Sequence, residues 1–93
     1  MQRILIKDLP DHIGEVVKVQ GWLQTLRDQK SMQFLVLRDK TGLVQVAHWK
    51  KGNPELAEAI SKLGTESALT IVGKVVANEV VRLGGLEIQL EDL

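Results

Sequence analysis

Two side chains in the middle of the chain have the chemistry to hold a flat polar ring. Phe34 lies in the run MQFLVLRD and Gln45 in the run LVQVA, and the turn-forming residues DKTG separate the two runs. Alternate residues of a strand point to opposite faces, so with Leu35 and Val44 in the core, Phe34 and Gln45 lie on the outer face. An exposed aromatic ring can stack on a nucleobase, and a neighbouring amide can hydrogen-bond to the edge of that base.

Alternating apolar residues predict the strands that position this pair. The strand-like runs cover residues 16–26, 32–39, 43–47, 67–79 and 86–93, and the last of them places Glu87 outward. Gly21 and Gly73 lie inside two of these runs, where a glycine often marks a bulge or a sharp bend. Residues 80–85, VVRLGG, are expected to form a turn.

One segment has helical rather than strand periodicity and is predicted to be a helix over about 54–63. Asn53 is a favourable N-cap, Pro54 suits the first helical position, and Gly64 suits the position after the end. The predicted apolar face consists of Leu56, Ala59, Ile60 and Leu63. We expect this face to close one end of a small barrel.

Composition limits the class of protein. Ninety-three residues form one domain, 1–93, with residues 1–14 as a lead-in segment before the first strand. The chain has no Cys and two His, so we expect neither a disulfide nor a metal site, and no cofactor motif is present. No apolar run reaches transmembrane length and the N-terminus lacks a signal-peptide pattern, which predicts a cytoplasmic module that does not contact membranes.

Charge is balanced overall and unevenly distributed. The formal net charge of +0 argues against a protein that binds any polyanion indiscriminately. Residues 27–51 are nevertheless basic, with six Lys and Arg against two Asp, whereas residues 52–93 hold three cations against seven acidic residues. The predicted outer site of Phe34 and Gln45 lies in the basic part.

The predicted order is three strands, one helix and two strands. This is the order of the five-stranded OB-fold, a Greek-key barrel that is all-β with one helix, and whose middle strands and end loops form the usual binding face. Interior glycines suit such a barrel, because small barrels need bends to close.

The chain also resembles a known family in several motifs. These motifs are GW followed by LQTLRD, then FLVLRDKTGLVQV, and later PELAEAISKL, TIVGKV and GGLEI. Together they resemble the N-terminal anticodon-binding domain of aspartyl- and asparaginyl-tRNA synthetases, and archaeal-type aspartyl enzymes in particular. The resemblance covers nearly the whole chain.

The resemblance implies a role for four residues. Arg27 would contact the anticodon loop, Phe34 would stack on the central anticodon base, a uridine, Gln45 would hydrogen-bond to that base, and Glu87 would contact a neighbouring base. The implied partners are the anticodon loop of tRNA-Asp or tRNA-Asn and the catalytic domain of a parent synthetase. The chain itself has no catalytic constellation and is expected not to be an enzyme. It is expected to be either an excised domain or a free-standing relative, with the end after LEDL favouring excision, and to be a monomer in isolation.

Two other functions fit the same barrel. A general single-strand nucleic-acid-binding domain would show little preference between sequences and a steep salt dependence. A protein-interaction barrel, or an engineered scaffold on this fold, would use the same face for a protein. Trp22 is expected to pack at the barrel wall, and Trp49, which lies beside Lys50 and Lys51, is assigned no role.

Overall fold

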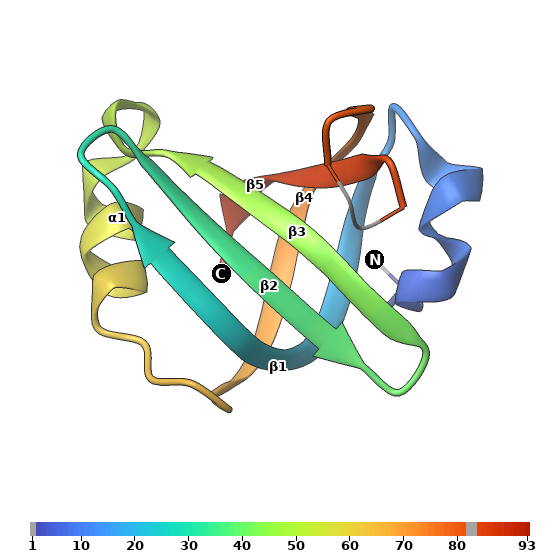
Figure 1. Cartoon of the computed structure of the whole chain (residues 1–93), viewed down its shortest axis with the longest axis horizontal. Helices are drawn as coiled ribbons and strands as arrows, with labels where there is room; N and C mark the ends of the chain where they lie inside the picture. Colours follow the sequence, from blue (N-terminus) through green and yellow to red (C-terminus); the bar gives the residue numbers. More distant parts are fainter. Residues whose placement is uncertain (1, 82–83) are drawn as a thin grey trace.

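The computed structural model describes residues 2–81 and 84–93, in which five strands and one α-helix are present (Figure 1). The elements are η1 (Ile6–His12), β1 (Val16–Asp28), β2 (Met32–Asp39), β3 (Gly42–Trp49), η2 (Lys50–Gly52), α1 (Pro54–Ser61), β4 (Ala68–Ala77) and β5 (Leu86–Asp92), where η denotes a 3-10 helix. The predicted turn at 80–85 falls partly on residues 82 and 83, which lie outside the described residues. No helix in the described part of the chain is long and apolar enough to cross a membrane.

The five strands close into a barrel in the order β1-β2-β3-β5-β4. β3 pairs in parallel with β5, whereas the other neighbours are antiparallel, and β1 closes the barrel by pairing with both β2 and β4. This arrangement confirms the predicted five-stranded OB-fold. The third strand is longer than predicted: β3 continues through His48 and Trp49, because Gln33 and Met32 of β2 pair with them.

Two glycines allow the barrel walls to approach one another closely. A Cβ atom on Gly21 would collide with the carbonyl group of Arg38 in β2, and one on Gly73 would collide with the carbonyl group of Gln89 in β5. A register irregularity lies at Gly73, as predicted, whereas the irregularity of β1 lies beyond Gly21, at residues 23–25. Only glycine tolerates these approaches, since any Cβ would have to displace backbone atoms.

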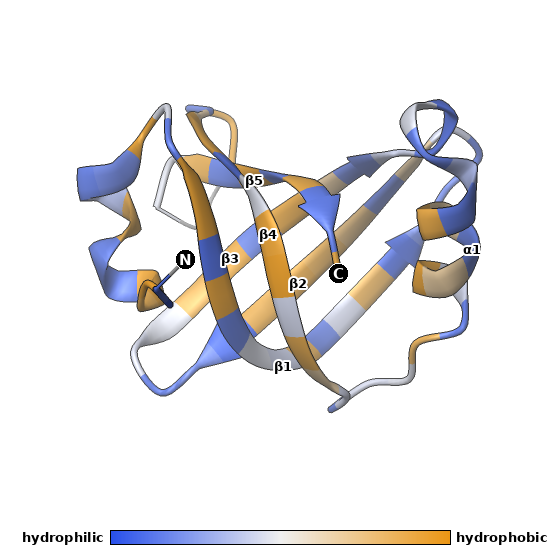
Figure 2. Ribbon diagram, turned by 180° about the vertical axis from the view of Figure 1, so that it is seen from behind, coloured by the Kyte–Doolittle hydropathy of each residue, from blue (hydrophilic) through white to orange (hydrophobic). Residues whose placement is uncertain are grey.

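The barrel interior is aliphatic, and Figure 2 shows hydrophobic and hydrophilic residues alternating along the strands. Its largest fully buried apolar side chains are Leu9, Leu23, Leu35, Leu37, Ile60, Ile71 and Ile88. All three aromatic residues lie outside this core: Trp22 is 44% exposed, Trp49 is 57% exposed, and Phe34 is half-buried. Trp22 lies on the outer side of the barrel wall, where the guanidinium carbon of Arg38 is 6.0 Å from the centroid of its ring.

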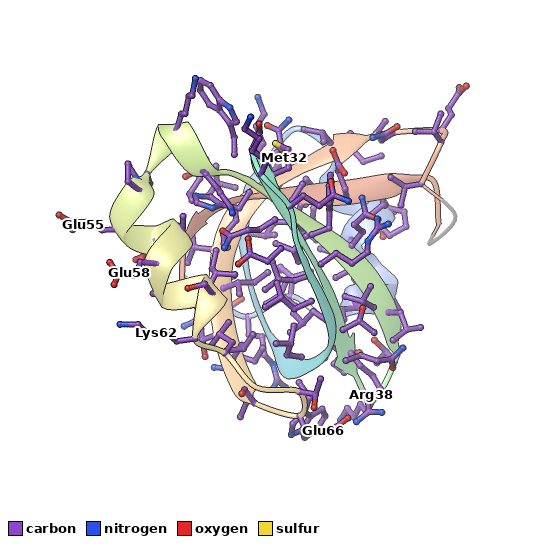
Figure 3. All side chains as sticks on the ribbon, turned by 60° about the vertical axis from the view of Figure 1, so that its left-hand side comes forward. Met32, Arg38, Glu55, Glu58, Lys62 and Glu66 are labelled. Atoms are coloured by element: carbon purple, nitrogen blue, oxygen red, sulfur yellow. The ribbon has the colours of Figure 1, made fainter. Side chains whose placement is uncertain are left out.

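The helix α1 closes one end of the barrel, as the sequence predicts. Asn53 Oδ1 accepts a hydrogen bond from Leu56 N at 3.1 Å, and Pro54 occupies the first turn. The buried residues of α1 are Leu56, Ala57 and Ile60, so Ala57 takes the place predicted for Ala59, and the helix ends at Ser61 rather than 63. Figure 3 shows Glu55, Glu58 and Lys62 pointing away from the barrel.

The lead-in segment covers the barrel at the side away from α1 (Figure 1). Ile6 and Leu9 of η1 are buried in the core, and Ile6 N donates to Asp39 Oδ2 at 2.9 Å. Burial alone would raise the pKa of Asp39, but hydrogen bonds from the Thr41 side chain and from backbone N–H groups of Ile6, Thr41 and Gly42 outweigh it and lower the pKa. Asp39 thus ties the β2–β3 turn to the lead-in segment.

Candidate nucleic-acid interface

The outer face of β1 and β2 carries an arginine against an aromatic ring. Arg27 and Phe34 are register partners in the antiparallel β1–β2 pairing, so their side chains leave the sheet side by side. The guanidinium carbon of Arg27 lies 5.3 Å from the centroid of the Phe34 ring, within the range of a cation–π contact. This contact holds a positive charge next to the flat surface of Phe34.

The parallel pairing of β3 with β5 brings a second pair of side chains together. Gln45 and Glu87 are register partners across these strands, although 42 residues separate them in the sequence, and Gln45 Nε2 donates to Glu87 Oε2 at 3.1 Å. An ionised carboxylate only accepts hydrogen bonds, so it fixes which end of the amide faces it. The carbonyl oxygen and the second N–H of Gln45 are then the groups that can meet a ligand.

One groove on the outer face collects all four residues that the sequence analysis singled out. It has a volume of about 600 Å³, and Arg27, Phe34, Gln45 and Glu87 line it. The other lining residues are Met32, Ala47, Asn78, Val80 and Val81. An aromatic ring, an amide, a guanidinium and a carboxylate therefore face one space, a set that can stack a base and hydrogen-bond to its edge.

A buried polar network supports this face from inside the barrel end. Gln33 and His48 are 0% and 4% exposed, and His48 Nδ1 lies 3.0 Å from Gln33 Oε1. Gln33 Nε2 donates to Ala57 O at 2.9 Å, so the network joins β2 and β3 to α1. Burial lowers the pKa of His48, because its charged form is poorly solvated there. Sequence reasoning missed both residues.

The signal that could have found them is strand alternation. Gln33 shares the inward phase of Leu35, and His48 shares the inward phase of Val46, so each falls on the core side. A polar residue in an inward phase predicts a buried hydrogen-bonding partner. Because the third strand is predicted to end at residue 47, His48 falls outside the predicted strand and its inward phase is not recognised.

An ion pair at the same end fixes the start of η2. Lys50 Nζ lies 2.5 Å from Asp28 Oδ1, and Lys50 N donates to Ser31 O at 3.0 Å. The hydrogen bond from Lys50 lowers the pKa of Asp28; burial raises it, and the contact with Gln33 lowers it further. Within the described residues, no three His, Cys, Asp or Glu side chains gather in a way that could hold a metal ion.

Known proteins match nearly the whole of this chain in sequence and in fold. Residues 17–93 match the tRNA anti-codon family, described as an OB-fold nucleic acid binding domain. The chain is 42% identical over 93 residues to an asparagine–tRNA ligase of Desulforamulus reducens, covering 100% of the chain and 21% of the ligase. It is 38% identical over 92 residues to an aspartate–tRNA(Asp/Asn) ligase of Deinococcus radiodurans, covering 99% of the chain and 19% of that protein.

Solved structures give the same result. The crystal structure of asparaginyl-tRNA synthetase from Pyrococcus horikoshii complexed with asparaginyl-adenylate superposes with a TM-score of 0.88 at 33% identity, covering 99% of this chain and 21% of that one. OBody AM3L09, bound to hen egg-white lysozyme, superposes with a TM-score of 0.75 at 28% identity, covering 87% of this chain and 80% of that one.

The 93 residues span about a fifth of the curated ligases and correspond to their OB-fold domain rather than to their catalytic part. The expectation that this chain is not itself the enzyme is confirmed on that ground. The chain belongs to the tRNA anticodon-binding family of OB-fold nucleic acid binding domains, in the form found in asparagine– and aspartate–tRNA ligases.

Proposed function

We propose that the groove binds the anticodon loop of tRNA-Asp or tRNA-Asn and contributes to the tRNA specificity of a ligase. Phe34 stacks on the central anticodon base, a uridine, and Gln45 hydrogen-bonds to the edge of the same base. Arg27 contacts the anticodon loop, and Glu87 contacts a neighbouring base. The observation that carries the proposal is the convergence of these four side chains, from β1, β2, β3 and β5, on one groove.

The chemistry of the groove supports an unpaired base as the ligand. A base that inserts beside Phe34 gains a stacking contact, and such contacts contribute roughly 1–3 kcal/mol per base. The amide of Gln45 distinguishes bases by their donors and acceptors, and its orientation is held by Glu87. A groove with one carboxylate and one arginine favours selected bases over a polyphosphate backbone.

The partners and location that we infer follow from the matched relatives. The catalytic domain of a ligase would be joined to this domain in one polypeptide chain. The ligase would act in the cytoplasm. In isolation the domain is inferred to be a monomer, since the proposed site lies within one chain.

The test is a fluorescence-anisotropy titration with a tRNA-Asp anticodon stem-loop at two salt concentrations. We expect binding that weakens when the central uridine is changed to adenosine, and a loss of roughly 1–3 kcal/mol for Phe34→Ala. Phe34→Leu is the matched control, because it keeps an apolar side chain and removes only the aromatic face. Its affinity should fall nearly as far as that of Phe34→Ala.

Other outcomes would favour the two alternative functions. Equal affinity for all loops, together with a steep salt dependence, would indicate a general single-strand binder. Absence of binding even at low salt would argue against RNA as the ligand of the isolated domain. It would favour a protein ligand, since OBodies, which share this fold, have been solved bound to hen egg-white lysozyme.

A further inference from the structure

The groove that holds Phe34 continues into a second groove along the same face of the barrel. The second groove has a volume of about 520 Å³ and shares Met32, Ala47 and Glu87 with the first. It extends past the shared residues to Trp49, the last residue of β3, and is bounded there by η2, the start of α1 and the end of β5. The proposed anticodon site therefore occupies only part of a longer channel.

Trp49 presents a fixed and open ring to this channel. Its side chain is 57% exposed, while its backbone pairs with Met32 in β2. A Cβ atom on Gly52 would lie 3.4 Å from Trp49 Cε3, so the indole rests against the backbone of Gly52. The Lys50–Ser31 hydrogen bond holds the chain directly after Trp49. A ring held in this way can stack a ligand at little entropic cost.

The distribution of aromatic residues supports a role for this ring in binding. Burying an aromatic side chain removes about 150–250 Å² from water, and such residues usually dominate a small core. Here the core is aliphatic and the three aromatic rings lie outside it. In residues 2–81 and 84–93, the cation–π contacts are Arg27 with Phe34 and Arg38 with Trp22, so no such contact covers Trp49.

The position of Trp49 along β3 decides which nucleotide it meets. Gln45, Ala47 and Trp49 share the outer phase of the strand, and at about 3.3 Å per residue Trp49 lies roughly 13 Å from Gln45. Glu87 pairs with Gln45 in register, whereas Phe34 pairs with Ala47, so the Phe34–Ala47 pair lies between the Gln45–Glu87 pair and Trp49. If Phe34 and Gln45 hold the central base and Glu87 its neighbour on one side, Trp49 lies on the other side of the central base. The base that meets Trp49 is then the remaining outer base of the triplet.

We propose that Trp49 is a second stacking platform, which binds the outer anticodon base on the opposite side of the central base from the one contacted by Glu87. This inference rests on the proposed function and extends its footprint over the whole anticodon triplet. Glu87 and Glu91 line the second groove. Their carboxylates repel phosphate, so the uncharged base, and not the RNA backbone, occupies the groove.

The chain offers a matched control for Trp49 in its other exposed tryptophan. Trp22 pairs with Arg38 and Trp49 pairs with Met32, and these two partners lie at opposite ends of β2 (Figure 3). Trp22 lines neither groove of the channel. Single-tryptophan proteins can therefore report on each end of the face separately.

The first experiment measures tryptophan fluorescence during titration with the tRNA-Asp anticodon stem-loop. Trp22→Phe leaves Trp49 as the single tryptophan, and its emission should be quenched when a base stacks on it. Trp49→Phe leaves Trp22, and its emission should stay unchanged. Saturating binding without quenching in the Trp22→Phe protein would overturn the proposal.

The second experiment measures affinity for stem-loops made abasic at one or the other outer nucleotide of the anticodon triplet. We expect Trp49→Ala to lower affinity by about 5- to 140-fold, the equivalent of one lost stacking contact, and Trp22→Ala to leave it unchanged. Removing the outer anticodon base on one side of the central base should cause the same loss in the wild type and no further loss in Trp49→Ala. Additive losses would show that the ring and the base do not meet.

The Phe34→Ala protein, measured in parallel, separates this inference from the proposed function. If Phe34→Ala weakens binding and Trp49→Ala does not, the inference on Trp49 is wrong and the anticodon site remains supported. If neither variant nor any change of base alters binding, the proposed function itself fails.

Discussion

Gln45 Nε2 donates to Glu87 Oε2 at 3.1 Å across the parallel pairing of β3 with β5. The hydrogen bond orients the amide of Gln45, since the opposite orientation would place its carbonyl oxygen against a carboxylate oxygen. With the nitrogen directed to Glu87, Oε1 of Gln45 can accept from a ligand. Uracil offers an N–H at N3 where cytosine has a lone pair, so the oriented amide favours uracil.

This orientation predicts the effect of Glu87→Gln. An amide at position 87 can accept or donate, so Gln45 becomes free to turn over and present either its oxygen or its nitrogen. We expect the ratio of the affinities for uridine and for cytidine at the central position to fall in the variant, by up to about tenfold. The measurement compares the affinities of two stem-loops that differ only at that base.

The readout is the ratio of two affinities, so a general weakening of the groove does not alter it. Glu87→Asp serves as the control, because it keeps an acceptor-only carboxylate and should retain part of the preference. A Glu87→Gln protein with the wild-type ratio would show that Glu87 does not orient Gln45.

Arg27 is expected to contribute a phosphate contact, whereas Phe34 is not. Arg27→Gln should therefore lower the slope of log affinity against log salt by about 0.7–1, the value for one phosphate contact. Phe34→Ala should lower affinity at every salt concentration and leave the slope unchanged. Titrations at four or more salt concentrations measure both quantities.

Arg27→Lys is the matched control for charge, and it should keep the slope while weakening the contact with the Phe34 ring. If Arg27→Gln binds with the wild-type slope, Arg27 acts only on the ring and not on the RNA backbone.

His48 predicts a loss of stability in mild acid. Burial lowers its pKa in the folded state, so between the ordinary value of 6.5 and this lowered value the unfolded chain binds more protons than the folded chain. The free energy of unfolding should therefore fall as the pH drops below about 6.5, by up to about 1.4 kcal/mol per pH unit. Urea unfolding at pH 7.5, 6.5 and 5.5 measures it.

His48→Gln should remove this dependence, while His12→Gln, which changes a histidine outside the core, should retain it. The lowered pKa values of Asp28 and Asp39 act in a separate window, because their contribution is present above about 3.8 and is lost as the pH falls further. A slope between pH 6.5 and 5.5 that persists in His48→Gln would assign the effect to other groups.

The sequence by itself determined the elements and the face on which the proposed site lies. The period of two in β2, β3 and β5 places Phe34, Gln45 and Glu87 outward, because side-chain direction in a strand is a local property. The capped helix at Asn53 and Pro54 is equally local and was predicted at its start within a residue. Family motifs then suggested which outward residues matter.

Only the tertiary structure decided which of these residues meet. The Gln45–Glu87 hydrogen bond, the Gln33–His48–Ala57 network and the adjoining of the two grooves at Met32 join segments far apart in the chain. Alternation gives the phase of a strand but neither its partner nor its register. Those depend on how the closed barrel packs, and the same packing left Trp22 and Trp49 outside an aliphatic core.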